Sequence, residues 1–300
     1  MWRQLQWECG DVAIRFSDSA NAAIFMDFGS FQTGITSGTF DRRAAPSVDG
    51  TMTYSASLGG MRVPIDARVL AFNMGSKGRP VELVIDQYKR LLCDAFNPKR
   101  TGILTYKCRT GEYFLTARPE SIPGFGAIDG GSLPFTVDLY SDDPYWQSTA
   151  IHTLDIGVTN PLVSTPMNLP AELGQIISTS SDVHNVTNND IYPVIRFWPS
   201  ESRIELTNET TGKRLRLNTQ ISDGLYVDVD TAPTKNTIIL YRLNSIGEYE
   251  ETDNVTYWLT LDSDSEFYIV PGINKIRADY VTAGTLPAVT ITWREREVGV

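Results

Sequence analysis

Residues 60–71 read Gly60-Met-Arg-Val-Pro-Ile-Asp-Ala-Arg-Val-Leu-Ala71, and this stretch decides the fold class. Every second side chain from Met61 to Ala71 is apolar, and Arg62, Asp66 and Arg68 lie between them. A period of two places the apolar side chains on one face of a β-strand and the polar ones on the other. The stretch therefore predicts a half-buried strand in a mainly β protein.

The same alternation recurs in both halves of the chain. Further alternating runs are Leu133–Leu139, Ile204–Leu206, Leu215–Leu217, Leu225–Val229 and Val289–Trp293. Threonine and aromatic residues, which suit half-buried strands, are frequent in these runs, and Gly, Asn, Asp and Pro separate them. Several short strands separated by turn residues are typical of a β-sandwich.

One segment departs from this pattern and predicts an α-helix at about residues 80–96. Pro80 suits the first turn of a helix, where its missing N–H group would have no partner in any case. The Asn97-Pro98 dipeptide ends the helix, because a residue before proline avoids the α conformation. The apolar side chains that form one helical stripe are Val84, Tyr88, Leu91, Leu92 and Ala95.

A change of composition near Ser141–Trp146 divides the chain into two predicted domains. Residues 1–147 form an N-terminal β-sandwich or barrel-like domain that carries the helix, and residues 148–300 form a C-terminal β-sandwich. Residues 157–190 are rich in Gly, Pro, Ser, Thr and Asn, so we expect long loops there. A chain of 300 residues buries enough surface to fold without disulfides or metals.

Charge and cysteine usage exclude several classes of protein. The net charge of −10 and the pI of about 4.8 disfavour direct nucleic-acid binding, because phosphate is repelled. Cys9, Cys93 and Cys108 form no disulfide framework and no Cys-x-x-Cys motif. The first ten residues lack a signal peptide's apolar core, and no stretch reaches the roughly 18 apolar residues of a membrane span. We expect a protein made in the cytoplasm, without a membrane partner, that leaves only within a larger particle.

No combination of residues predicts catalysis, a metal or a cofactor. His152 and His184 lie in polar surroundings without further ligands at zinc spacing. The acidic runs Asp228-Val-Asp230 and Asp262–Glu266 lack the glycine and glutamate that an EF-hand loop requires. We expect the first run on the outward face of a strand and the second in a solvated turn, with adventitious metal binding as the alternative. We therefore assign no catalytic, cofactor or metal residues and expect no enzyme.

Three tryptophans in the second half, Trp198, Trp258 and Trp293, allow two interpretations. Core packing is the first, because a buried indole removes a large apolar area from water. An exposed platform on which sugar rings stack is the second. Trp293 alternates with Val289 and Ile291, so we expect it on a buried face. We favour core packing for all three.

Several short motifs, taken in order, resemble the distal tail protein family of long-tailed phages. The resemblance covers nearly the whole chain, although Thr187-Asn-Asn-Asp190 stands where relatives often have Asn-x-Gly. The motifs of the first half are Gly60–Ile65, Tyr88–Leu92, Phe96-Asn-Pro98, Thr101–Thr105 and Asp143-Pro-Tyr-Trp146, and those of the second half are Pro193–Ile195, Ile204–Gly212 and Val270–Ile276.

The resemblance implies a structural virion protein, a hub of the tail tip or baseplate. In that family the N-terminal domains form a homohexameric ring, and a galectin-like C-terminal sandwich of the jelly-roll kind projects outward. The implied partners are other copies of the chain, the tail tube protein, tail-tip or receptor-binding proteins and the tape measure protein. DNA would pass through the ring lumen without specific binding. The protein would be assembled in the host cytoplasm and reside at the virion's tail tip.

Two alternatives to this hub remain. The chain could be a carbohydrate-binding module whose C-terminal sandwich binds host-wall glycans and so contributes to adhesion to the host surface. It could also be a cell-wall hydrolase, which would need a pair of carboxylates or a metal centre that the sequence does not offer.

Overall fold

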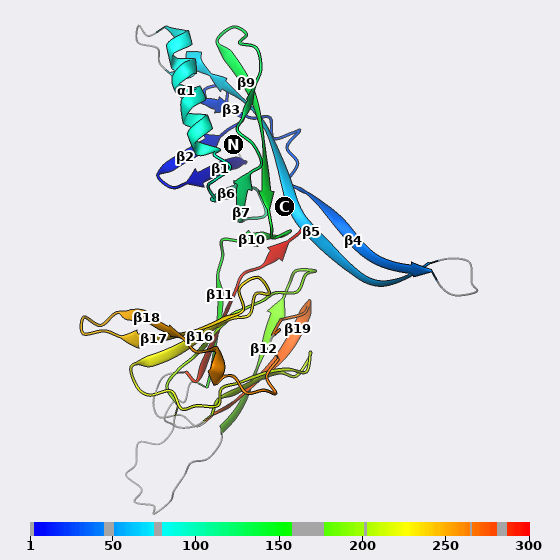
Figure 1. Ribbon diagram of the computed structural model, residues 1–300, viewed down its shortest axis with the longest axis vertical. Coiled ribbons are helices and arrows are strands. Elements are labelled where there is room, and N and C mark those ends of the chain that lie inside the picture. Colours follow the sequence, from blue (N-terminus) through cyan, green and yellow to red (C-terminus); the bar gives the residue numbers. More distant parts are fainter. Residues whose placement is uncertain are drawn as a thin grey trace, which may run out of the picture. The chain divides into compact units, whose positions relative to one another are not determined.

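The computed structural model describes residues 3–44, 51–74, 80–157, 177–200, 203–264, 266–280 and 287–300 (Figure 1). The chain divides into two compact units. The first unit comprises Met1–Thr149 together with Glu297–Val300, and the second comprises Ala150–Arg296. The chain therefore passes from one unit to the other twice, once after Thr149 and once after Arg296.

The first unit is built on one largely antiparallel sheet, eleven-stranded in its described residues. The strand order is β2-β1-β6-β7-β9-β5-β3, with β4 paired to β5, β8 to β9, and β10 to both β7 and β21. The strands are β1 (Gln4–Cys9), β2 (Val12–Phe16), β3 (Ile24–Phe25), β4 (Ile35–Ala44), β5 (Thr51–Leu70), β6 (Gly102–Lys107), β7 (Glu112–Pro119), β8 (Gly124–Phe125), β9 (Ser132–Ser141), β10 (Trp146–Ser148) and β21 (Arg296–Glu297).

The two ends of this strand order meet. Ser17, directly after β2, forms a parallel β-bridge with Phe25 of β3, so the sheet curls into a nearly closed barrel. Closure removes most of the unpaired strand edge that an open sheet would leave. The predicted barrel-like N-terminal domain is confirmed.

Strand β5 supplies the centre of the first core. Its second half, Met61–Leu70, pairs residue by residue with Ser132–Ser141 of β9. The alternating side chains predicted to face inward are all buried. Pro64 lies in the stretch Val63–Ala67, which has a ladder partner on the β9 side only, so its missing N–H group is tolerated. The buried side chains that β5 and β9 contribute are Met61, Val63, Ile65, Ala67, Val69, Leu133, Phe135, Val137 and Leu139.

The predicted helix is present as α1 (Val81–Ala95), after the short 3-10 helix η1 (Ala71–Met74). Its buried residues are Val84, Ile85, Leu92 and Ala95. The predicted stripe was wrong at Leu91, which is exposed. Ile85 takes its place, because Ile85 and Leu92 are seven residues apart and so share one face of the helix.

Two aromatic side chains fix the C-terminal end of α1. One is Phe96 of the Phe96-Asn-Pro98 motif, and the other is Trp7 of β1. The ring of Phe96 stacks on that of Trp7, with centroids 5.6 Å apart. Trp7 Nε1 donates a hydrogen bond of 2.8 Å to the carbonyl oxygen of Ala95, one of the helix-end carbonyls that lack a helical partner. Asn97 Oδ1 accepts a 3.0 Å hydrogen bond from the backbone N–H of Lys99, which shapes the turn that follows.

The second unit is a sandwich of a six-stranded and a four-stranded sheet, which confirms the β-sandwich prediction. A short 3-10 helix, η2 (Thr256–Trp258), follows β18. The six-stranded sheet has the order β11 (His152–Ile156), β20 (Val289–Trp293), β13 (Val194–Phe197), β16 (Leu225–Asp230), β17 (Thr237–Leu243) and β18 (Tyr249–Asn254). The four-stranded sheet has the order β12 (Ile177–Asn185), β19 (Gly272–Tyr280), β14 (Glu205–Asn208) and β15 (Lys213–Arg216).

One core joins these two sheets. The six-stranded sheet contributes Ile195, Phe197, Val227, Val229, Val289 and Ile291, and the four-stranded sheet contributes Leu206, Leu215, Ile276 and Ala278. Six of these ten residues come from the alternating runs of the sequence, whereas Ile195, Phe197, Ile276 and Ala278 come from β13 and β19, which those runs did not include. The other face of each sheet points away from this core.

Strand β12 differs from the expectation of loops at 157–190. Ile177–Asn185 pairs along its whole length with β19. It occupies the edge of the four-stranded sheet, and among its described side chains only Val183 and Asn185 are buried. A strand that buries so few side chains carries no apolar alternation by which the sequence could reveal it. Residues 158–176 lie outside the described part of the chain.

Three buried asparagines fix the turns beside β12, β14 and β19. Asn274 Nδ2 donates to the carbonyl oxygen of Val270 at 2.7 Å, and Asn208 Nδ2 donates to that of Tyr268 at 2.9 Å. Asn208 Nδ2 also lies 3.3 Å from Asn274 Oδ1, which links the two turns. Asn185 Nδ2 donates to the carbonyl oxygen of Asn189 at 2.8 Å. Asn208 and Asn274 belong to resemblance motifs, so those motifs are explained by buried polar groups that must find partners.

Gly102 of β6 offers a test of the close packing around Trp7. A β-carbon at Gly102 would lie 2.6 Å from the Trp7 indole and closer still to the carbonyl oxygen of Glu8, and neither can move freely. We expect Gly102→Ala to lower the free energy of unfolding by about 1–3 kcal/mol, measured by chemical denaturation. Gly124→Ala is the matched control, because its β-carbon would meet only Thr136 Oγ1, at 3.4 Å. Equal stabilities of the two variants would contradict the packing argument.

Candidate functional site

The hairpin β4–β5 extends beyond the barrel as an arm (Figure 1). We define the arm as Gly38–Arg42 with Thr53–Leu58. These residues pair only with each other, whereas the rest of β5 from Met61 onward pairs with β9. All side chains of the arm are exposed, on both faces of the hairpin. A two-stranded ribbon of this kind is marginally stable in water by itself.

One face of the arm is apolar and the other is polar. In the ladder Phe40 lies opposite Ala56, and Gly38 lies opposite Leu58, so these residues share one face of the hairpin, and Tyr54 follows at the register shift beside Asp41 and Arg42. Phe40, Tyr54 and Leu58 are 50%, 62% and 40% exposed. The opposite face carries Thr39, Asp41, Ser55 and Ser57. The guanidinium carbon of Arg42 lies 4.7 Å from the centroid of the Phe40 ring. An amphipathic ribbon with large apolar side chains exposed on one face is typical of a protein interaction surface.

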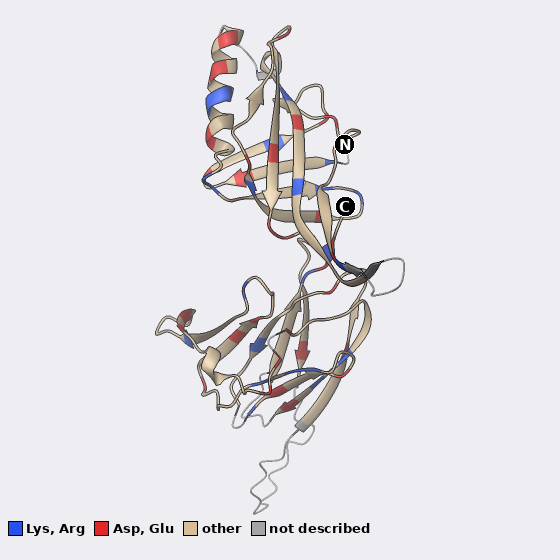
Figure 2. Cartoon of the chain, turned by 45° about the vertical axis from the view of Figure 1, so that its right-hand side comes forward, with Lys and Arg blue, Asp and Glu red and all other residues tan. Residues whose placement is uncertain are grey.

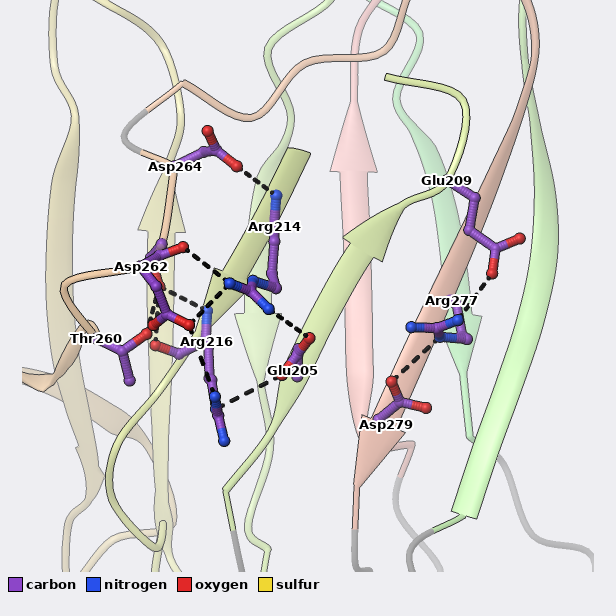
Figure 3. Close-up of polar contacts among 10 residues, drawn as sticks. Glu205, Glu209, Arg214, Arg216, Thr260, Asp262, Asp264, Arg277 and Asp279 are labelled. Carbon is purple, nitrogen blue, oxygen red and sulfur yellow. Dashed lines mark hydrogen bonds and ion pairs between the residues drawn. The ribbon is translucent and has the colours of Figure 1, made fainter. Parts of the chain in front are cut away.

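Acidic and basic residues are interspersed on the strands of the second unit (Figure 2). On the four-stranded sheet and the adjoining turn they form an ion-pair network (Figure 3). Arg214 Nη2 lies 2.8 Å from Asp262 Oδ2, and Arg214 Nη1 lies 3.6 Å from Glu205 Oε1. Arg216 pairs with the same two carboxylates, at 3.5 Å to Glu205 and 3.7 Å to Asp262. Each of these four side chains therefore has two partners.

Lys213 and Asp264 adjoin this network, and Arg277 forms a separate cluster on the same sheet (Figure 3). Asp264 accepts from Lys213 Nζ at 3.2 Å and from the backbone N–H of Arg214 at 2.8 Å. Arg277 lies 3.1 Å from both Glu209 and Asp279. Charges shared among several partners are held in place at a smaller entropic cost than an isolated surface pair. The network therefore rigidifies the outward face of this sheet.

In the predicted solvated turn, Asp262 is exposed, and the ion pairs of Asp262 and Asp264 also anchor the turn to β15. The hydroxyl of Thr260 and, to a smaller extent, the guanidinium groups of Arg214 and Arg216 lower the pKa of Asp262, against the opposing effect of desolvation. Sequence reasoning missed these contacts because Arg214 and Arg216 are about fifty residues away along the chain. The described residues contain no group of three or more His, Cys, Asp or Glu side chains arranged to hold a metal ion.

The outward face of the six-stranded sheet carries an aromatic patch, which we define as Trp198, Tyr226, Tyr241 and Tyr249. Tyr226 is buried beneath the other three rings, with centroid distances of 5.4 Å to Trp198, 4.8 Å to Tyr241 and 4.7 Å to Tyr249. Asp228 points outward on the same strand, as predicted, and pairs with Arg196 of β13. The sequence signalled Trp198 and Asp228 but not their neighbours across the sheet.

Core packing was only partly right for the tryptophans. Trp258 and Trp293 pack against the core of the second unit, but both are half-buried, as is Trp198. Trp293 ends β20 and stacks on His152 of the edge strand β11, with centroids 5.5 Å apart. His184 is exposed on β12, so the two histidines lie on different strands of different sheets.

The first unit has an open hollow of about 840 Å³. It is lined by both charge signs and by apolar side chains, including Arg3, Asp27, Tyr106, Arg109 and Val300. None of the three cysteines forms a disulfide. Within the described ranges, no helix has both the length and the apolar character needed to cross a bilayer.

No protein-family model and no curated protein sequence matches the chain, so the comparison with known proteins depends on the fold. The Dit protein of phage SPP1 aligns over 98% of this chain and 99% of its own, with a TM-score of 0.62 and 16% identity. This chain has the fold of a phage distal tail protein. The distal tail fold includes both units, since the alignment spans nearly the whole chain.

Two other solved structures are similar to the chain. They are structures of the phage P2 baseplate in its activated conformation, one with Ca and one with Sr. Both show 10% identity, with TM-scores of 0.49 and 0.47 over 99% or more of each chain. The SPP1 protein is presented as a paradigm of the hub adsorption apparatus in phages that infect Gram-positive hosts.

The anchored turn predicts a titration that can be measured. Because the pKa of Asp262 is lowered, its charge stabilises the fold above about pH 4, and that contribution is lost as the pH falls through the lowered pKa. We expect Thr260→Val to raise the pKa of Asp262, measured by carboxyl ¹³C NMR. Thr252→Val, whose hydroxyl bonds to Glu250 in an exposed strand, is the control and should leave it unchanged. An unchanged pKa of Asp262 in Thr260→Val would show that the hydroxyl of Thr260 does not lower it.

Proposed function

We propose that the chain is a structural component of a phage tail tip or baseplate, in which six copies form a ring. The correspondence with the SPP1 Dit protein over almost the full length of both chains supports this role. The observation that carries it within the molecule is the arm, whose apolar face is exposed in a single chain.

The geometry of the arm suits a ring. The apolar face is narrow and belongs to a projecting hairpin. The surface of a neighbouring copy that binds this hairpin must therefore differ in shape from the hairpin itself. A contact between two different surfaces of identical subunits is heterologous, and it closes into a ring when the rotation between neighbours divides a full turn. Burial of Phe40, Tyr54 and Leu58 by a neighbouring copy would contribute about 1.5–3 kcal/mol for each fully buried side chain. We therefore assign ring formation to the first unit, in the segment expected at residues 1–147.

The remaining partners follow from this role. In the proposal the ring joins the tail tube protein on one side to tail-tip or receptor-binding proteins on the other, and it accommodates the tape measure protein. The second unit, in the segment expected at residues 148–300, projects from the ring. The net charge of −10 favours free passage of DNA through the lumen, because an acidic wall repels phosphate. No catalytic step is part of this function.

The ring is tested by the mass of the protein in solution. We expect native mass spectrometry to show a species near six times the 33.4 kDa subunit mass, and negative-stain microscopy to show rings. The double variant Phe40→Ser with Leu58→Ser should weaken assembly at least tenfold, because it makes the apolar face of the arm polar.

The matched control is Thr39→Ala with Ser57→Ala, which alters two paired residues on the polar face of the arm. This variant should assemble like the unchanged protein, and all variants should keep its circular dichroism spectrum. A strict monomer at every concentration, also with the tail tube protein added, would refute the ring. Normal assembly of the Phe40→Ser, Leu58→Ser double variant would show that the arm does not form the contact between subunits.

A further inference from the structure

The aromatic patch lies on the face of the six-stranded sheet that points away from the sandwich core. In β16, Val227 and Val229 enter the core, whereas Tyr226 and Asp228 point outward. Tyr241 pairs with Tyr226 across the ladder, and the two rings stack at 4.8 Å with 17° between their planes. Tyr249 is 37% exposed, and Trp198 and Tyr241 are half-buried. The patch therefore presents ring surfaces to solvent over a buried tyrosine that holds them in place.

Fixed polar groups lie directly beside these rings. Arg196 donates from Nε and Nη2 to the two carboxylate oxygens of Asp228, both at 2.8 Å. The guanidinium carbon lies 4.0 Å from the centroid of Tyr226, so the ion pair is held against the aromatic patch. On the other side, Trp198 Nε1 donates to Thr290 Oγ1 at 2.8 Å, which in turn donates to Asp155 at 2.6 Å. Hydrogen-bonding groups at this site are thus preorganised by their partners.

Local charge indicates which ligand fits. The charges of Arg196 and Asp228 neutralise each other through the two-point contact, so the ion pair closest to the rings carries no net charge. Burial raises the pKa of both Tyr226 and Tyr241, so their hydroxyl groups stay protonated at neutral pH. A neutral molecule with flat C–H faces and many hydroxyl groups matches rings flanked by donors and acceptors. A pyranose has this chemistry.

We propose that the aromatic patch, with Arg196 and Asp228 beside it, binds neutral pyranose units of an oligosaccharide. One sugar ring stacks on the exposed aromatic surface, and its hydroxyl groups bond to the remaining lone pairs of Asp228 and to the tyrosine hydroxyl groups. This site is independent of the arm, which belongs to the other unit. It gives the outward sheet face of the second unit a role in adhesion to glycans.

The test uses the full chain and three neutral probes: cellopentaose, chitopentaose and maltopentaose. We expect saturable binding of at least one probe, with a Kd between about 10 μM and 3 mM, by isothermal calorimetry and saturation-transfer NMR. Tyr241→Ala and Trp198→Ala should each weaken that binding at least tenfold, because each removes a stacking ring. Tyr241→Phe, which keeps the ring, should stay within about threefold.

Two controls distinguish binding at the aromatic patch from binding elsewhere on the chain. Tyr257→Ala removes an aromatic ring that is 74% exposed and outside the aromatic patch, and it should bind the sugar normally. The arm variant Phe40→Ser with Leu58→Ser should also bind normally, whether or not it assembles. No saturable binding of any probe up to about 10 mM would overturn the proposal, as would equal binding by a folded Tyr241→Ala variant, with folding checked by its thermal midpoint.

Discussion

Strand β5 must satisfy two environments along one continuous ladder, and the architecture of the first unit depends on this constraint. From Met61 to Leu70 the strand has β9 beside it, and one of its faces is sealed in the core. From Thr51 to Leu58 it has only β4, and both faces of its described side chains meet solvent. The buried half fixes the register and direction of the exposed half, because a slip of one residue would turn Met61, Val63 and Ile65 outward. The arm is therefore held by the same alternation that builds the barrel.

The sequence predicts a helix or strand correctly wherever that element buries side chains at a regular spacing. The alternation at Met61–Ala71 and the helical stripe of α1 both report burial directly, although Leu91 and Ile85 show that a stripe of adjacent apolar residues leaves the exact face open. Strand β12 carried no such signal, because an edge strand with polar side chains on both faces follows no period. The outward-facing groups were also hidden, since Arg196 and Asp228, or Arg214 and Asp262, meet only through ladders and turns that join distant residues.

The two sheets of the second unit use their outward faces differently. The four-stranded sheet carries salt bridges in which Glu205, Arg214, Arg216 and Asp262 each have two partners, and this leaves few unpaired groups for a ligand. The six-stranded sheet carries large rings with one ion pair beside them. Removing water from paired charges costs free energy because these groups are strongly hydrated, whereas removing water from aromatic ring faces costs little. The same fold thus offers one face that favours solvent and one that favours contact.

The return of the chain to the first unit constrains how recombination can exchange the second unit during evolution. Strand β10, where the chain leaves the first unit, is hydrogen-bonded to β21, where it comes back, and Val300 packs against the first core. The second unit is thus an insertion between two neighbouring points of the first. A single recombination event near residue 150 would exchange the sandwich together with the closing strand of its host domain. Clean replacement of the sandwich requires two breakpoints, and a sequence inserted between them needs only ends that lie close together.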